Sequence, residues 1–151
     1  MNEIFIEIYR NKIFMVTIFS WIIAQSIKVT FGIIRERRFD FRWFIGTGGM
    51  PSSHAAGAAC LATAVGIEYG FSSVHFALAA SFAIVVMFDA HVVRHSAGRQ
   101  AHILNKIMED IYWQHRIHET RLRELIGHTP IEVIMGALLG ITIAFFSMTR
   151  S

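Results

Sequence analysis

The stretch SSVHFALAASFAIVVMFDAHVV, residues 72–93, decides the fold, because it contains no Asp, Glu, Lys or Arg before Asp89. A helix that crosses a bilayer core needs about 20 mostly apolar residues. Three further stretches have a similar character, namely residues 13–34, 52–69 and 129–148. The sequence therefore predicts an all-α, polytopic membrane helix bundle with about four transmembrane helices.

The composition supports this class. Of the 151 residues, 54% are hydrophobic and 17% are charged, whereas soluble domains hold about 45–50% apolar and about 25% charged residues. The length suits a single domain over residues 1–151. The net charge is +3, but the bases form no arm or aromatic-interleaved stripe, so we expect no nucleic-acid binding. The lone Cys60 excludes an internal disulfide.

Small residues recur in two segments at the spacing that lets membrane helices approach closely. In the second segment, small residues recur every four positions, at Ala58, Ala62, Gly66 and Gly70. In the fourth segment, Gly136 and Gly140 have GxxxG spacing. We expect both patterns to serve helix packing.

Residues 94–128 are polar, and their apolar positions follow the i, i+3, i+4 spacing of an amphipathic helix. These positions are Ile103, Leu104, Ile107, Met108, Ile111 and Tyr112. The segment is too charged to span a bilayer. We expect it to lie against the membrane surface or against the bundle.

The bases predict the orientation. Four spans put the regions 35–42 and 94–123 on one side, which together with Lys28 holds eleven Lys and Arg residues, while the other side holds Arg10, Lys12 and Arg150. Lys and Arg concentrate in cytoplasmic loops. We therefore expect this face to be cytoplasmic, with both termini outside, in a plasma or inner membrane.

The sequence GGMPSSH, residues 48–54, enters the second apolar segment. Its glycines free the turn, and Ser52 or Ser53 can cap the helix. The N–H groups of such a helix start can hold an anion, and His54 in the first turn can donate a proton to a leaving oxygen. The alternative is an ordinary capped helix start with a polar histidine at the interface.

The sequence GHTPIE, residues 127–132, has two interpretations. Thr129 as N-cap, with Glu132 three residues later, makes a capping box. His128 and Glu132 are also at i and i+4, which lets a carboxylate orient an imidazole for nucleophilic attack. A metal site of the His-x-x-x-Glu type lacks a third ligand here.

Two charged pairs lie at the ends of apolar segments. Lys28 and Arg35 are about two helical turns apart on one face, and Lys28 either binds phosphate or extends to the basic face. Asp89 and Arg94 form either a functional pair or a structural ion pair. A metal transporter would instead use Asp89 with His91 and His95.

These motifs resemble the type 2 phosphatidic acid phosphatase superfamily. Its first motif is Lys, six residues, then Arg-Pro; here Glu36 follows Arg35 in place of the proline. Its second motif is Pro-Ser-Gly-His, which reads PSSH at 51–54. Its third motif ends in His, three residues, Asp, matched by His128 and Glu132, but Leu122 stands where its arginine is expected.

The chain is most similar to the divergent branch of that superfamily, which is related to acid phosphatases and vanadium-dependent haloperoxidases. The branch pattern is present as GGMPSSH at 48–54, DAHVVR at 89–94, AGRQAHILN at 97–105 and GHTPIEV at 127–133. An insertion at about 99–124 would make Arg94 the missing arginine; Arg123 is the other candidate.

The resemblance implies hydrolysis of a phosphomonoester through a phosphohistidine, without metal or cofactor. His128 would be the nucleophile, Glu132 its orienting carboxylate and His54 the general acid. The phosphate would be bound by Lys28, Arg35, Arg94 and the backbone amides of Ser52 and Ser53. The implied substrate is a phospholipid or isoprenoid phosphate. The competing hypothesis is a non-catalytic membrane protein that binds lipid phosphate or serves as a structural partner, and a homo-oligomer remains an open option.

Overall fold

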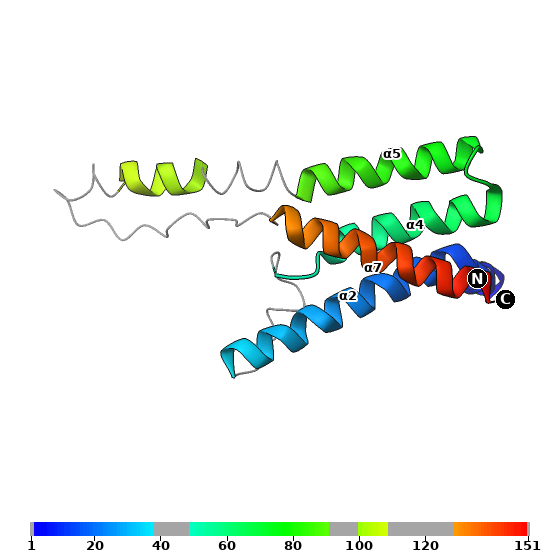
Figure 1. The fold of residues 1–151 in the computed structure, drawn as a ribbon, viewed down its shortest axis with the longest axis horizontal. Coiled ribbons are helices and arrows are strands. Elements are labelled where there is room, and N and C mark those ends of the chain that lie inside the picture. The colour runs from blue at the N-terminus through cyan, green and yellow to red at the C-terminus, as the bar shows by residue number, and fades with distance from the viewer. Residues whose placement is uncertain (1, 38–48, 91–99, 109–128, 151) are drawn as a thin grey trace.

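The computed structural model describes residues 2–37, 49–90, 100–108 and 129–150, and every regular element in these ranges is a helix. The elements are α1 (Asn2–Arg10), α2 (Lys12–Glu36), α4 (Ser53–Tyr69), α5 (Val74–Phe88), a helix over 100–108 and α7 (Pro130–Thr149). Figure 1 shows α2, α4, α5 and α7 running alongside one another as a bundle. The all-α prediction is therefore confirmed for these residues.

Helix α4 is the centre of the bundle, because α2, α5 and α7 all contact it. Most of its residues are buried, and the small side chains of Ala58 and Ala62 let α5 approach at Ala83. On another side of α4, the GxxxG pair of α7 lies against its backbone. A Cβ atom on Gly136 would overlap the carbonyl oxygen of Ser52, and one on Gly140 would overlap that of Ala56. The predicted role of this pair in close packing is confirmed.

Gly70 departs from the small-residue pattern. It is the C-cap of α4 with φ of +87°, and a Cβ there would meet nothing within 4 Å. Its role is to end the helix in a backbone conformation that glycine adopts freely, so the prediction that it packs against a neighbouring helix is wrong. Gly66, one turn earlier, lies against Phe71 of the α4–α5 turn and Phe76 of α5, as the packing prediction expects.

Two of the four expected spans are long and apolar enough to cross a membrane, Lys12–Ile34 and Pro130–Thr149. Helix α5 is apolar but has only 15 residues, since Ser73 caps its start and Asp89 and Ala90 leave it in a π-helical turn. Helix α4 has 17 residues, many of them Ala or Gly. The expected count of about four spans is thus supported for α2 and α7 by length and composition.

The expected amphipathic helix is described in part. Residues 100–108 are helical and expose Ile103, Leu104 and Ile107, while Asn105 is buried. This helix lies beyond the end of α5 (Figure 1). Residues 109–128, which complete the predicted amphipathic segment, lie outside the described ranges.

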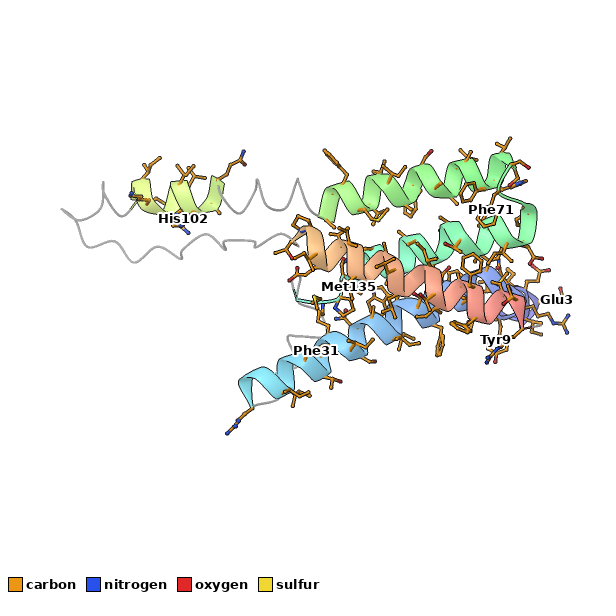
Figure 2. All side chains as sticks on the ribbon, viewed as in Figure 1. Glu3, Tyr9, Phe31, Phe71, His102 and Met135 are labelled. Carbon is orange, nitrogen blue, oxygen red and sulfur yellow. The ribbon has the colours of Figure 1, made fainter. Side chains whose placement is uncertain are left out.

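The ends of the helices define two ends of the bundle. The C-terminal ends of α2 and α5 and the N-terminal ends of α4 and α7 lie at one end, and both chain termini lie at the other (Figure 1). The first of these, which we call the motif end, holds the described residues of the PSSH, Asp89–Ala90 and Thr129–Glu132 stretches. Side chains such as Tyr9 mark the opposite end, as Figure 2 shows.

Substitution at Gly140 tests the α4–α7 contact. We expect Gly140→Ala to lower the unfolding temperature in detergent, because its Cβ would overlap the Ala56 carbonyl and approach the Cys60 nitrogen at 3.0 Å. Overpacking of this kind costs about 1–3 kcal/mol. The matched control is Gly57→Ala, whose Cβ would meet Trp21 at an ordinary 3.9 Å. Equal unfolding temperatures for the two variants would contradict this packing.

Candidate functional site

Lys28 is a buried cation at the motif end. It lies on the inward face of α2, where its relative exposure is 9%. Gly49 lies against its aliphatic stem, since a Cβ on Gly49 would be 3.1 Å from Lys28 Cγ. The φ of Gly49 is +89°, so both the backbone conformation and the lack of space require glycine. The Lys28 side chain is thus enclosed within the bundle and does not extend along its surface.

The start of α4 lies beside Lys28. Ser52 is fully buried and is the N-cap of the helix, with its Oγ accepting a hydrogen bond from the Ala55 N–H at 3.4 Å. Ser53 is buried in the first turn, and His54 is exposed. Of the two expected caps, Ser52 therefore fills the role. The exposed His54 lies in the first turn of α4 at the motif end, and its role as a general acid stays a prediction.

The start of α7 forms the predicted capping box. The Thr129 Oγ1 accepts from the Glu132 N–H at 3.4 Å, and Glu132 Oε2 accepts from the Thr129 N–H at 3.1 Å. The capping-box prediction is confirmed. His128, the partner of Glu132 in the catalytic interpretation, lies outside the described residues, so that interpretation stays a prediction.

The starts of α4 and α7 are joined directly. The Ser52 N–H donates to the Glu132 carbonyl oxygen at 3.0 Å, and Gly136 one turn later lies against the Ser52 carbonyl. The Ser52 amide is therefore used in this junction. Among the two amides expected to bind phosphate, only that of Ser53 remains directed to the start of the helix, where first-turn N–H groups have no partner within the helix.

Glu132 and Lys28 belong to the same junction. The Glu132 carboxylate lies close enough to Lys28 for the two opposite charges to attract each other. Both residues also take part in other polar or electrostatic interactions. Two helix N-termini carry partial positive charge, and Lys28 adds a full one. Lys28 and the two helix N-termini thus place positive charge at this junction beside the Glu132 carboxylate, and helix N-termini of this kind can bind anions.

The end of α5 also reaches this junction. Ala90 is buried and packs with Ala55 of α4 and Val133 of α7. Asp89 is half-buried in the π-helical turn just before it. Such π-helical turns are frequent at functional sites. Asp89 thus lies near this junction, and its role in a site stays a prediction.

Several candidates have no described side chain. Arg35 lies in α2 two turns after Lys28, but its side chain is outside the described part of the protein, as are Arg94 and Arg123 altogether. The structure therefore brings together Lys28, Ser52, Ser53 and Glu132, with His54 and Asp89 at the edge. The contributions of the three arginines and of His128 stay predictions.

The sequence interpretation missed two residues. Gly49 was seen only as part of a flexible turn, yet it covers the Lys28 stem. Gly136 was seen only as a packing residue, yet it brings the start of α7 against Ser52. Two sequence features could have revealed these roles: the Gly48-Gly49 dipeptide, and the position of Gly136 one turn after Glu132.

Comparisons with known proteins agree with these motifs. The family model described as "Divergent PAP2 family" matches residues 9–143. The chain is 38% identical to the "Uncharacterized membrane protein YuiD" of Bacillus subtilis (strain 168), over 94% of this chain and 99% of that protein. No solved structure matches the chain.

Proposed function

Because the chain belongs to the divergent PAP2 family of membrane proteins, we propose that it is an integral membrane phosphatase that hydrolyses a lipid phosphate monoester. The observation that carries this proposal is the burial of Lys28 at the junction where the α4 and α7 N-termini meet. Burial fixes the positive charge of Lys28 beside two helix N-termini, which also carry partial positive charge. Phosphoryl transfer depends mainly on positioning and charge compensation, and this junction offers both.

The proposed chemistry uses two histidines and a carboxylate. The His128 imidazole attacks phosphorus in line, the bond to the leaving alcohol oxygen breaks, and His54 gives that oxygen its proton. Water then attacks the phosphohistidine and gives its proton to His54, which releases inorganic phosphate and restores both groups. Glu132 holds the His128 tautomer throughout. The mechanism needs no metal or cofactor, because the protein supplies nucleophile, acid and charge compensation.

The cationic partners of the phosphate are Lys28, Arg35 and Arg94 in this proposal. Arg94 is preferred to Arg123 because Ala90, four positions earlier, is buried against Val133 at the junction. An extended chain covers at most about 3.6 Å per residue, so Arg94 stays within reach of the site. Residues 99–124 are then an insertion between the two halves of the third motif.

The proposed substrate is a phospholipid or isoprenoid phosphate. The outward faces of α5 and α7 carry large apolar side chains, among them Leu78, Phe82, Ile134 and Leu138, which suits contact with lipid tails. The candidate site lies at one end of the bundle, where the headgroup of a lipid would lie. The phosphate group of a lipid could then enter the site from the bilayer, while the acyl or isoprenyl chains of that lipid stay in the bilayer.

The test is phosphate release by the purified protein, in detergent with a chelator, from a panel of phospholipid and isoprenyl phosphates. We expect release from at least one lipid phosphate by the native protein and none by His128→Ala. Incubation with a ³²P-labelled substrate and alkaline quenching should trap an alkali-stable phosphohistidine in the native protein only. Absence of release from the whole panel would refute catalysis on these substrates.

The second candidate function is a lipid-phosphate binder without turnover. It is favoured by Glu132 Oε2, which is engaged in the capping box, and by Leu122 where the superfamily has an arginine. The same panel separates the two hypotheses. Binding of lipid phosphate by both native protein and His128→Ala, with no release and no phosphoenzyme, would establish the binder.

We further propose that α4 and α5 cross the membrane with α2 and α7, both termini outside, so that the site faces the cytoplasm. The eleven-to-three distribution of bases supports this orientation. Cysteines introduced at positions 40 and 116, after Cys60→Ser, should not react with an impermeant reagent in intact cells. A cysteine at the exposed Ser72, in the α4–α5 turn, should react. The reverse pattern would invert the topology.

A further inference from the structure

Helix α1, residues Asn2–Arg10, presents an apolar face that no other described helix covers. Its large side chains are exposed, with relative exposures of 62% for Ile4, 67% for Phe5 and 73% for Tyr9. At 100° per residue, the apolar side chains Ile4, Phe5, Ile6, Ile8 and Tyr9 occupy one broad arc, and Glu3, Glu7 and Arg10 occupy the remainder. The helix is thus amphipathic, with both signs of charge on its polar side.

The position of α1 relates it to the two candidate spans. Helix α2 begins at Lys12 and α7 ends at Thr149, and these two ends lie together at the end of the bundle opposite the motif end (Figure 1). Helix α1 contacts α2 there, and Figure 2 labels Glu3 and Tyr9 at the same level. The helix therefore lies where a membrane crossed by α2 and α7 would end.

Asn11 makes α1 a separate helix. Its side chain accepts a hydrogen bond from the Phe14 N–H at 3.0 Å, so it is the N-cap of α2. The chain can then change direction between Arg10 and Lys12. An amphipathic helix connected in this way to a span can lie along the membrane plane.

The outer surface of α2 near α1 is also apolar. The first half of α2 exposes Phe14, Ile18, Phe19 and Ile22, which are large apolar side chains on a helix long and apolar enough to span. A bilayer that covers these side chains would also lie next to α1, because α1 contacts α2. The mixed charges of α1 indicate that hydrophobic contact holds it there, and attraction to anionic lipids does not.

We propose that α1 is an interfacial helix, embedded by its apolar face at the membrane boundary opposite the site, and that it sets the depth of α2 in the bilayer. At ~1.5 Å per residue, Lys28 lies about 24 Å along α2 from Lys12. The hydrocarbon core is about 30 Å thick. With the start of α2 held at one boundary by α1, Lys28 comes close to the other, where lipid headgroups lie. This inference rests on α2 and α7 crossing the bilayer and is independent of phosphatase activity.

The test uses single cysteines labelled with an environment-sensitive fluorophore (NBD) in the full chain carrying Cys60→Ser, reconstituted in phosphatidylcholine vesicles. The matched pair is Phe5→Cys on the apolar side and Glu7→Cys on the polar side of α1. Shallow doxyl-phosphatidylcholine should quench the probe at position 5 several-fold more than the probe at position 7, with little dependence on salt. Equal quenching at both positions would overturn the proposal. A probe at position 5 that is shielded from water but not quenched by doxyl lipid would also overturn it, in favour of a protein partner.

The depth-setting role has its own measurement. A probe at Phe31, exposed one turn after Lys28, reports the depth of the other end of α2 by comparing quenching from shallow and deep doxyl lipids. Replacing Ile4, Phe5 and Ile8 together by serine should shift that depth by several ångströms, whereas replacing Glu3 and Glu7 by glutamine should not. An unchanged depth in the triple variant, with unfolding temperature retained, would refute the role of α1 in placing Lys28.

Discussion

Glu132→Gln is expected to lower the rate of phosphate release by about 10⁴-fold, the loss seen when an orienting carboxylate beside a catalytic imidazole becomes an amide. An amide cannot stabilise the imidazolium character that develops on His128, and it can favour the wrong tautomer. The fold should be retained, because the Gln oxygen can still accept the Thr129 N–H that Glu132 Oε2 accepts at 3.1 Å. The Glu132 carbonyl that receives the Ser52 N–H is backbone and is unchanged. The measurement is single-turnover phosphate release together with thermal unfolding in detergent.

The control separates the cap from the catalytic pair. Thr129→Ala removes the Oγ1 that accepts from the Glu132 N–H and should cost about 1 kcal/mol of stability, with the activity of each folded molecule largely retained. If Glu132 serves only the capping box, Thr129→Ala should be the more damaging change and Glu132→Gln should have almost no effect. A Glu132→Gln protein that folds and turns over normally would leave the cap as its one role.

Lys28→Met is expected to lower phosphate release by about 10²–10³-fold, the loss typical of removing one preorganised donor to developing charge. Methionine can occupy the position of the aliphatic part of Lys28 next to Gly49. It has no positive charge with which to bind the phosphate. The fold should remain, because methionine has a similar length and can fill the same buried position. Inorganic phosphate should also bind more weakly, which equilibrium dialysis would measure. The matched control is Lys12→Met, at the opposite end of the same helix, with activity close to that of the native protein.

Lys28→Arg sharpens this test. Arginine keeps the charge, but its planar guanidinium is larger than the lysine ammonium and presents its N–H donors in a different geometry. We expect partial activity, between those of the native protein and Lys28→Met. Near-normal activity in both variants would remove Lys28 from the site and return it to a structural role.

The helices and their local signals could be predicted from the sequence. Apolar runs of sufficient length predicted the bundle, and Thr129 and Glu132 predicted a capping box that the structure contains. These features depend on residues three or four positions apart, so a helix forms them from its own side chains. The Gly136 and Gly140 spacing predicted close packing for the same reason, because both residues share one face of a helix. Family membership followed from short motifs that are each contiguous in the sequence.

Only the tertiary structure decided what these elements do together. The Ser52 amide was expected to bind phosphate, yet it donates to the Glu132 carbonyl of another helix. Lys28 could equally have extended to the surface, yet Gly49 from a different segment encloses its stem. The lengths of α4 and α5 depend on where Gly70 and Ser73 turn the chain between them. For Ser52 and Lys28 the deciding contact joins residues far apart in the chain, and no local periodicity encodes such a contact. It arises when small residues on α4 and α7 let their backbones approach, which brings two helix starts and a buried cation to one place.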